Sequence, residues 1–399
     1  MVGAGMLALP MVSASAGFVW GASLMVLLWL VSTVTGLLVL EVNLALPSQN
    51  STFSSMAEKT IGTSGKVFTW IVTLFFMYTM IVAYIIGEAD ILANYLSSTF
   101  NYKVPNAVLS TLFTAILGIA VFWSTAAADY VNRGLMTAKG ILVVIALLAL
   151  IPYANVGNLF NQVGIAQTNY LWIAVPAFLC AYSFQFIVPS LRMYLGDDPK
   201  QLRSVIVIAT TISMLIYLWW LASILGVVPL EGANNSITSL SEVEGASVGM
   251  FIQLIITIAG NKWVSWAING FTIIAMTTAF IGVSLALFDF LTDGLKLKGS
   301  RSDRLQIALM TFIPPLVFAV MYPDGFVKAI SYIAVPVSIL ALVLPTMMAL
   351  KLRSNTELKS PYRSNCGNMV LWAIMLMGIV ACVLSVMCIF NLLPGIKVG

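Results

Sequence analysis

A charged residue within an apolar stretch costs free energy and commonly serves a function, and three such residues are candidates for proton coupling. They are Lys139 in Thr-Ala-Lys-Gly-Ile-Leu, Glu88 in Tyr-Ile-Ile-Gly-Glu-Ala-Asp, and Glu41 near the end of a long apolar run. Because the chain contains no histidine, proton coupling would have to use carboxylates, lysine, hydroxyls or water. Each group also has a structural alternative: Lys139 could snorkel to the membrane surface, Glu88 could face a solvated vestibule, and Glu41 could pair with a loop cation.

The apolar stretch Val2–Pro10 contains residues whose backbone could serve as a ligand. Gly3 and Gly5 flank Ala4, and Met6 follows them directly. Glycine weakens a helix and lets another chain segment approach its backbone closely. The cluster therefore indicates one of two structures. It is either a close contact with a neighbouring helix, or a helix that unwinds within the membrane and presents free backbone groups to a substrate or ion.

A second interrupted apolar segment spans residues 170–192. Pro176 and Pro189 frame its centre, and proline removes a backbone donor and disturbs the preceding turn. Inside a membrane the freed backbone groups need partners within the protein, so the segment is either a kinked packing helix or an unwound binding element. If the chain is two repeats, the interrupted segments open each half, as in secondary transporters. The polar and aromatic residues at this centre are Tyr182, Ser183, Phe184 and Gln185.

Composition places these segments in a multi-pass membrane protein, because 60% of the residues are hydrophobic and only 9% are charged. The four cysteines show neither metal-ligand nor disulfide spacing, so we expect no metal and no cofactor. With about 20 apolar residues per span, the sequence predicts an all-α fold of eleven spans. These are 1–17, 19–46, 67–97, 106–123, 138–154, 170–192, 204–228, 262–291, 305–322, 325–350 and 369–391.

The lysines and arginines orient these spans. With the N-terminus on the cytoplasmic side, fifteen of the 19 basic residues fall inside and four fall outside, as the positive-inside rule requires. The whole chain, 1–399, is then a single membrane domain with its C-terminus on the outer side. The polar segment 48–65 has room for a short cytoplasmic helix. The apolar piece 249–259 is too short to span and is expected to lie on the outer mouth.

Three stretches, residues 2–10, 183–191 and 277–294, resemble signature stretches of the hydroxy and aromatic amino acid permease family, especially its bacterial tyrosine- or tryptophan-specific members. This resemblance implies the five-plus-five inverted-repeat, leucine-transporter-like fold of the amino acid–polyamine–organocation superfamily, with helices 1 and 6 broken. Repeat one would span 1–154 and repeat two 170–350, followed by an extra helix at 369–391. It also implies a proton-coupled symporter in the bacterial inner membrane that imports an aromatic amino acid by alternating access. Its partners would be the amino acid, protons and lipid, without nucleic acid.

The resemblance also implies roles for individual residues. Lys139 would replace a sodium ion near helices 1 and 8, and Thr277 and Thr278 resemble hydroxyl ligands of that ion site. These two threonines could equally hydrogen-bond to the preceding helical turn. Backbone groups at the helix breaks would hold the substrate's carboxylate and ammonium. The residues expected to contact its ring, by stacking or hydrogen bonding, are Tyr84, Phe184 and Gln185.

Two departures from the family pattern stand out. Relatives have another half-helix before the Gly-Ala-Gly break, whereas this chain starts at Met1, so we expect a trimmed N-terminus or a misassigned start. Ser183 stands where relatives often have glycine. Three alternatives stay open: serine, threonine or another neutral amino acid as cargo, sodium as the coupling ion, and an intramembrane enzyme or channel. The last is disfavoured, because the sequence has no histidine, no Gly-x-Ser-x-Gly and no continuous polar lining.

Overall fold

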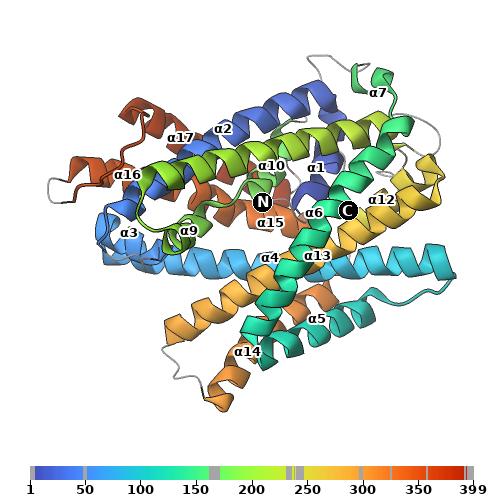
Figure 1. Ribbon diagram of the computed structural model, residues 1–399, viewed down its shortest axis with the longest axis horizontal. Helices are drawn as coiled ribbons and strands as arrows, with labels where there is room; N and C mark the ends of the chain where they lie inside the picture. Colours follow the sequence, from blue (N-terminus) through green and yellow to red (C-terminus); the bar gives the residue numbers. More distant parts are fainter. Residues whose placement is uncertain are drawn as a thin grey trace.

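The computed structural model of the chain is all-helical over the residues that it describes. These are residues 5–47, 52–160, 171–230, 236–237, 239, 247–295, 300–323, 326–355, 358–390 and 392. Long helices run along the longest axis of the molecule or cross it obliquely (Figure 1). Their buried faces share one contiguous hydrophobic core, and many large apolar side chains are exposed on the outer faces, as expected for a lipid-facing surface.

Within the described residues, ten helical stretches are long and apolar enough to cross a membrane, and they correspond to the second to eleventh predicted spans. Two of them are composite and are described below. The eight single helices are α2 (Gly17–Leu44), α4 (Thr63–Phe100), α5 (Asn106–Trp123), α6 (Thr125–Leu150), α10 (Pro199–Val227), α13 (Lys262–Leu295), α14 (Arg301–Met321) and α17 (Asn368–Ile389).

The first predicted span, 1–17, takes a different form. Its described part is the nine-residue helix α1 (Gly5–Ser13), followed by the 3-10 turn η1 (Ala14–Ala16). Helix α6 also differs from expectation, because it begins at Thr125 and not at 138. The Ser124 side chain caps it by accepting a hydrogen bond from the backbone N–H of Ala127, which adds a polar first half to the apolar run.

The sixth span is interrupted, as its two prolines predict. Helix α8 (Leu171–Ala181) ends before a short non-helical stretch, the 3-10 turn η4 (Gln185–Ile187) follows, and α9 (Val188–Leu195) completes the span. The freed backbone carbonyl of Ala181 accepts a hydrogen bond of 3.0 Å from the Tyr217 hydroxyl on α10. A neighbouring helix therefore satisfies the backbone at the break, which is what a membrane interior requires.

The first interrupted segment packs directly against the second. Helix α1 lies on α8, and a Cβ added at Gly5 would be 3.4 Å from the Ala181 Cα atom. An added methyl group would just touch the neighbouring helix, so the two backbones lie close together here. The remaining composite span consists of α15 (Phe326–Ser338), the π-helical turn η5 (Ile339–Val343) and α16 (Leu344–Ser354).

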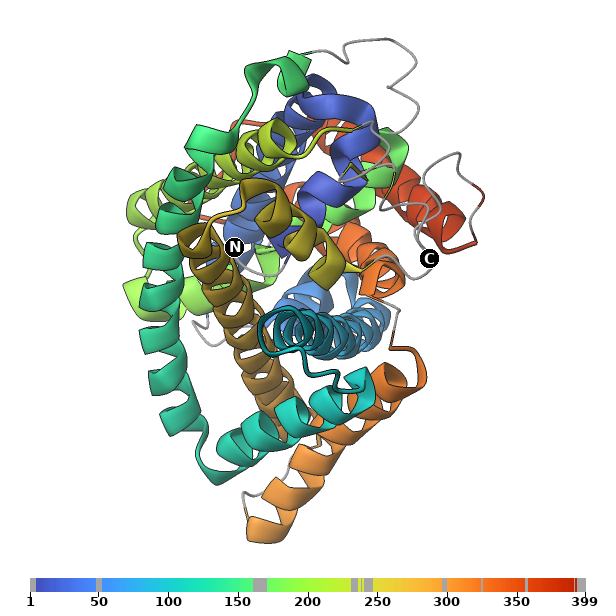
Figure 2. The same ribbon diagram turned by 90° about the vertical axis from the view of Figure 1, so that its right-hand side faces the viewer.

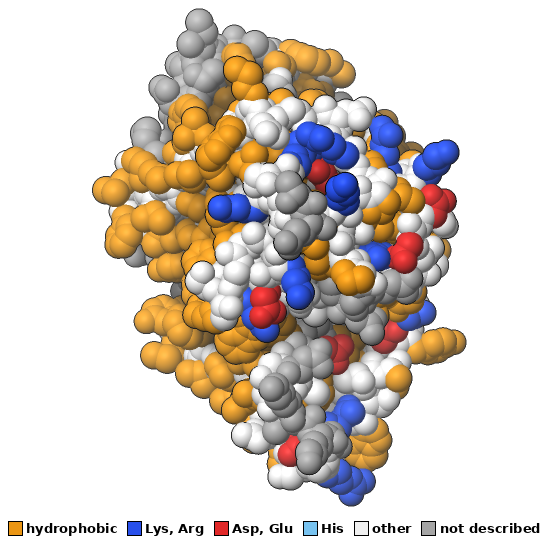
Figure 3. All heavy atoms as spheres, turned by 90° about the vertical axis from the view of Figure 1, so that its left-hand side faces the viewer, with side chains coloured by type: hydrophobic (Ala, Val, Ile, Leu, Met, Phe, Trp, Pro, Cys, Tyr) orange, Lys and Arg blue, Asp and Glu red, His pale blue; other side chains and the backbone are white. Residues whose placement is uncertain are grey.

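Two predicted short helices lie at opposite ends of the bundle, α3 at the left of Figure 1 and α12 at the right. Helix α3 (Phe53–Ile61) confirms the helix expected within 48–65. Helix α12 (Val248–Ala259) confirms the one expected at 249–259, and Figure 2 looks onto the end where it lies. Lysine and arginine side chains gather at the α3 end (Figure 3), and the five-residue helix α7 (Val156–Phe160) lies at the α12 end.

Candidate functional site

A cavity of about 840 Å³ lies where the two interrupted segments meet the long helices α4, α6 and α13. Its wall includes side chains from both sides of the break in the sixth span, such as Ala181 and Ile187. The predicted site residues that line it are Gly5, Tyr84, Lys139, Ser183 and Thr278. A site of this size, at the break of a helix, is large enough for a small organic molecule.

The cavity extends from these residues toward the end of the bundle that carries α3. Thr52 and Ser54, at the start of α3, line it there, together with Asp289 and Phe290 from the last turns of α13. This is the end at which basic side chains gather (Figure 3). At the other end, α12 packs on α4, where Asp90 Oδ2 accepts a 2.6 Å hydrogen bond from the backbone N–H of Gly249.

Lys139 is buried in the cavity wall, with only 5% of its surface exposed. Its Nζ donates to the hydroxyl oxygen of Thr278 on α13 at 3.2 Å, and that hydroxyl donates to the carbonyl oxygen of Ala275 at 3.1 Å. The threonine therefore bonds to its own helix and also accepts from the amine. Among the described residues, no carboxylate lies within ion-pair distance of Lys139. A buried amine that pairs with a neutral hydroxyl alone can exchange a proton without breaking a salt bridge.

Glu88 lies on the other side of the same pair of threonines. The carboxylate is 1% exposed, and the Thr277 side chain lies beside it. Its Oε2 atom has no partner among the described residues. Glu88 is not among the side chains that line the cavity. The structure thus brings Lys139, Thr278, Thr277 and Glu88 together around one turn of α13.

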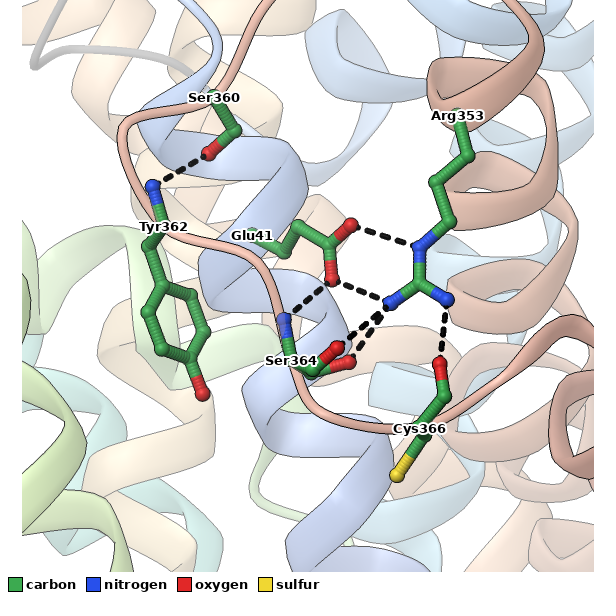
Figure 4. Close-up of polar contacts among 6 residues, drawn as sticks. All are labelled: Glu41, Arg353, Ser360, Tyr362, Ser364 and Cys366. Carbon is green, nitrogen blue, oxygen red and sulfur yellow. Dashed lines mark hydrogen bonds and ion pairs between the residues drawn. The ribbon is translucent and has the colours of Figure 1, made fainter.

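Glu41 lies apart from this group, at the end of α2. Its two carboxylate oxygens accept hydrogen bonds of 2.8 and 2.7 Å from Nε and Nη2 of Arg353 on α16 (Figure 4). The side chains are 2% and 4% exposed, so this is a buried, bidentate ion pair. Arg353 lies at the end of a span. It therefore resembles the loop cation that the sequence analysis named as an alternative partner of Glu41.

Three predicted site residues of the break face away from the cavity. The Tyr182 ring lies 5.3 Å from that of Tyr217, centroid to centroid. The ring of Phe184 packs on the backbone of Gly36, where an added Cβ would come within 2.5 Å of it. Gln185 Nε2 donates to Thr35 Oγ1 at 3.0 Å and to the Ser32 carbonyl at 3.4 Å. Their side chains therefore hold the unwound segment against α2 and α10.

Other aromatic residues line the cavity instead. Phe76 on α4 and Phe186 in η4 lie edge to face, with ring centroids 5.5 Å apart. Phe290 lines the same space near the basic end. The sequence analysis chose Phe184 and missed Phe186, which lies two residues later in the same aromatic cluster. Helical periodicity does not tell which side chain of an unwound segment faces a cavity. Of the first break, Gly3 and Ala4 lie outside the described residues, and Met6 is buried in the core.

Comparisons with known proteins identify the family of the chain. Residues 1–385 match the tryptophan/tyrosine permease family. The tyrosine-specific transport system 1 of Haemophilus influenzae is 32% identical over 380 residues, which cover 95% of this chain and 92% of that protein. The tryptophan-specific transport protein of Pseudomonas aeruginosa is 29% identical over 396 residues, covering 98% and 93% of the two chains.

A solved structure shares the fold. The manganese transporter of Eremococcus coleocola, crystallised with an aromatic bis-isothiourea substituted compound, superposes with a TM-score of 0.60. The match covers 97% of this chain and 86% of that one at 12% sequence identity, so it bears on the fold alone. The fold is therefore the leucine-transporter-like arrangement expected from the sequence. With residues 1–385 matching throughout, the chain is a multi-pass membrane transport protein and belongs to the tryptophan/tyrosine permease family.

Proposed function

We propose that this permease imports an aromatic amino acid, tryptophan or tyrosine, together with a proton, by alternating access across the bacterial inner membrane. The observation that carries the proposal is the cavity of about 840 Å³, where aromatic rings, a helix break and a buried lysine meet. The names of the relatives support the choice of cargo, since they are tyrosine- and tryptophan-specific transport proteins. The proposal also keeps the expected repeats, 1–154 and 170–350, as the units that move against each other.

The cavity wall suits an aromatic ring. Phe76, Phe186 and Tyr84 offer ring faces and edges, and such contacts add about 0.5–1.5 kcal/mol each beyond the burial of area. Met77 and Met80 lie on the same wall, and methionine adapts to the shape of an aromatic ligand. A small cargo such as serine would leave most of this space to water. The lining therefore favours an aromatic amino acid over serine or threonine.

The backbone at the break suits the charged end of an amino acid. Beyond Ser183 the helix restarts with η4 and α9, and the first N–H groups of a restarting helix have no partners within it. They would bind the substrate carboxylate, helped by the half-helix dipole. Carbonyl oxygens at the end of α8, which can each accept a second hydrogen bond, would accept from its ammonium. Those of Gly3, Ala4 and Gly5 would join them if the first segment unwinds there, of which the structure describes only Gly5. In this scheme Ser183 contributes its carbonyl oxygen, since its N–H and its hydroxyl both donate to the Cys180 carbonyl, at 3.3 and 2.7 Å.

Lys139 is the residue that would carry the coupled proton. A charged amine donates to Thr278, which fixes α6 against α13, and a neutral amine loosens that contact. Glu88, which lies beside Thr277, would be the second proton site. Sodium coupling is the alternative, and it would require Lys139 to point away from α13. The hydrogen bond to Thr278 favours protons, because the amine occupies the place where a cation would sit.

The direction of opening follows from charge. By the positive-inside rule, the end of the molecule at which basic side chains gather would be the cytoplasmic side. The proposal keeps the expected N-terminus inside and C-terminus in the periplasm. The cavity extends toward that end, while α12 lies at the opposite end of the molecule. This arrangement corresponds to an inward-facing state, from which the substrate would leave into the cell.

Uptake into proteoliposomes tests the proposal. The purified chain is reconstituted, and radiolabelled tyrosine or tryptophan is offered with an inward proton gradient in sodium-free buffer. We expect accumulation that a protonophore abolishes and that unlabelled aromatic amino acids block, while serine does not. Uptake that requires sodium would show that sodium, and not the proton, is the coupling ion. Uptake that only unlabelled serine or threonine blocks would show that the cargo is a small hydroxy amino acid and not an aromatic one.

A further inference from the structure

Two buried arginines converge on the cytoplasmic end of α2. Arg192, on α9, is 3% exposed and donates through Nη1 to the carbonyl oxygens of Asn43 and Leu46 at the end of α2. Its Nε donates to Asp197 Oδ1 at 2.6 Å. The last carbonyls of a helix have no hydrogen-bond donors within the helix, and they carry the partial negative charge of its dipole. A buried guanidinium at this position donates to the carbonyls and also neutralises that charge.

Arg353, near the end of α16, binds the same end of α2. It holds Glu41 in the bidentate pair described above, and its Nη1 and Nη2 also donate to the carbonyl oxygen of Cys366 at 2.6 Å and to Ser364 Oγ at 2.8 Å (Figure 4). Glu41 Oε2 in turn accepts from the backbone N–H of Ser364 at 2.9 Å. The carboxylate and the guanidinium thus both bind the chain segment that connects α16 to α17.

Satisfied groups of this kind form a rigid junction. A buried ion pair stabilises a structure only when its remaining donors and acceptors are also bonded, and here they are. The fork of an arginine fixes direction as well as distance. Through the end of α2, the junction connects α9 to α16 and to the segment from Ser364 to Cys366. Helix α9 is also a wall of the cavity, which it lines with Pro189, Ser190 and Met193.

We infer that Arg192, Glu41 and Arg353 are positioning residues that hold α9 in the place that keeps the cytoplasmic mouth of the cavity open. The segment from Ser364 to Cys366, which precedes α17, is then part of the cytoplasmic gate. Loosening the junction frees α9 to close the mouth, so the inward-facing state becomes less populated. This inference rests on the proposed alternating access, but accessibility of the cavity can be measured without transport.

Cys180 supplies the probe, because it lines the cavity. The other three cysteines are replaced by alanine, and labelling by a membrane-impermeant maleimide is timed from each side in oriented vesicles. Glu41→Gln removes the charge but keeps the shape, and we expect cytoplasmic labelling of Cys180 to slow at least fivefold. The maximal uptake rate should fall with it, while KM changes less than twofold. Ser364→Ala removes one hydrogen-bond acceptor of Arg353 without leaving a buried charge, so it tests the junction if Glu41→Gln folds poorly. We expect it to slow the cytoplasmic labelling of Cys180 about twofold.

Glu58→Gln is the matched control. Glu58 pairs with Lys66 at 2.9 Å at the same end of the molecule, but both side chains are well exposed. We expect wild-type labelling, since exposed pairs contribute little. A merely structural role for the junction would lower thermal stability and leave cytoplasmic labelling of the folded protein unchanged. Wild-type labelling rates in Glu41→Gln and Ser364→Ala would therefore overturn the inference. If labelling changes as expected in a chain that transports no aromatic amino acid, the proposed cargo is contradicted and the inference about the junction is retained.

Discussion

Gly36 on α2 lies outside the cavity, yet its substitution should impair transport through the unwound segment. A Cβ at this position would lie 2.5 Å from Cζ and 2.7 Å from Cε2 of Phe184. Carbon atoms in contact normally lie about 3.5–4.0 Å apart, so the ring would have to move by roughly 1 Å. Phe184 is only 8% exposed and immediately follows Ser183. The displaced ring would therefore pull on the backbone that is proposed to bind the substrate carboxylate.

The size of the effect follows from overpacking. Inserting a methyl group into a packed core costs about 1–3 kcal/mol. If this cost falls on the binding-competent arrangement of the break, affinity drops by about 5- to 150-fold in Gly36→Ala. Initial rates of tryptophan or tyrosine uptake over a range of concentrations measure the rise in KM directly. Equilibrium binding in detergent should show the same loss.

Two variants separate this cause from general damage. Gly134→Ala, on the exposed part of α6, adds a methyl group with nothing within 4 Å and should transport like the wild type. Adding Phe184→Leu to Gly36→Ala removes the clashing ring atoms and should recover most of the lost affinity. A Gly36→Ala protein with wild-type KM, or one that Phe184→Leu does not rescue, would refute the proposed link between α2 and the unwound segment.

Three further substitutions test other parts of the site. Lys139→Gln should abolish accumulation driven by a proton gradient but preserve exchange of labelled for unlabelled substrate at equal pH; persistent accumulation would remove the amine from coupling. Phe186→Ala should raise the KM for tryptophan by about 5- to 50-fold with little effect on weak small competitors, because aromatic contact and burial are lost; an unchanged KM would mean that the ring does not bind substrate. Gly249→Ala places a Cβ 2.7 Å from the Asp90 carbonyl oxygen and should displace α12, so that maleimide added outside labels Cys180 faster; unchanged labelling would show that α12 does not cover that end.

Much of the fold could be predicted because each membrane span corresponds to a long run of apolar residues. Ten of the predicted spans correspond to helices, and both short helices outside the spans were found. Local composition decides these features. The start of α6 at Thr125 was missed, since its first half is polar and is set by the cap at Ser124, which an apolar window does not detect.

The site was predictable only in part. The prolines located the break in the sixth span, and the resemblance pointed to the contact between Lys139 and Thr278, which the structure contains. The orientation of the side chains after Ser183 could not be predicted, because an unwound segment has no fixed period. Arg353 was equally hidden as the partner of Glu41, since 312 positions separate the two residues and only the folded chain brings them together.

Simultaneous recording of substrate and proton movement tests the central proposal most directly. Proteoliposomes containing the wild-type chain or Lys139→Gln carry an internal pH indicator and receive radiolabelled tryptophan or tyrosine in sodium-free buffer. We predict that the wild type acidifies the interior as the amino acid enters, and that Lys139→Gln equilibrates the amino acid without acidification. Uptake of the amino acid by the wild type with no change in internal pH would contradict proton-coupled import.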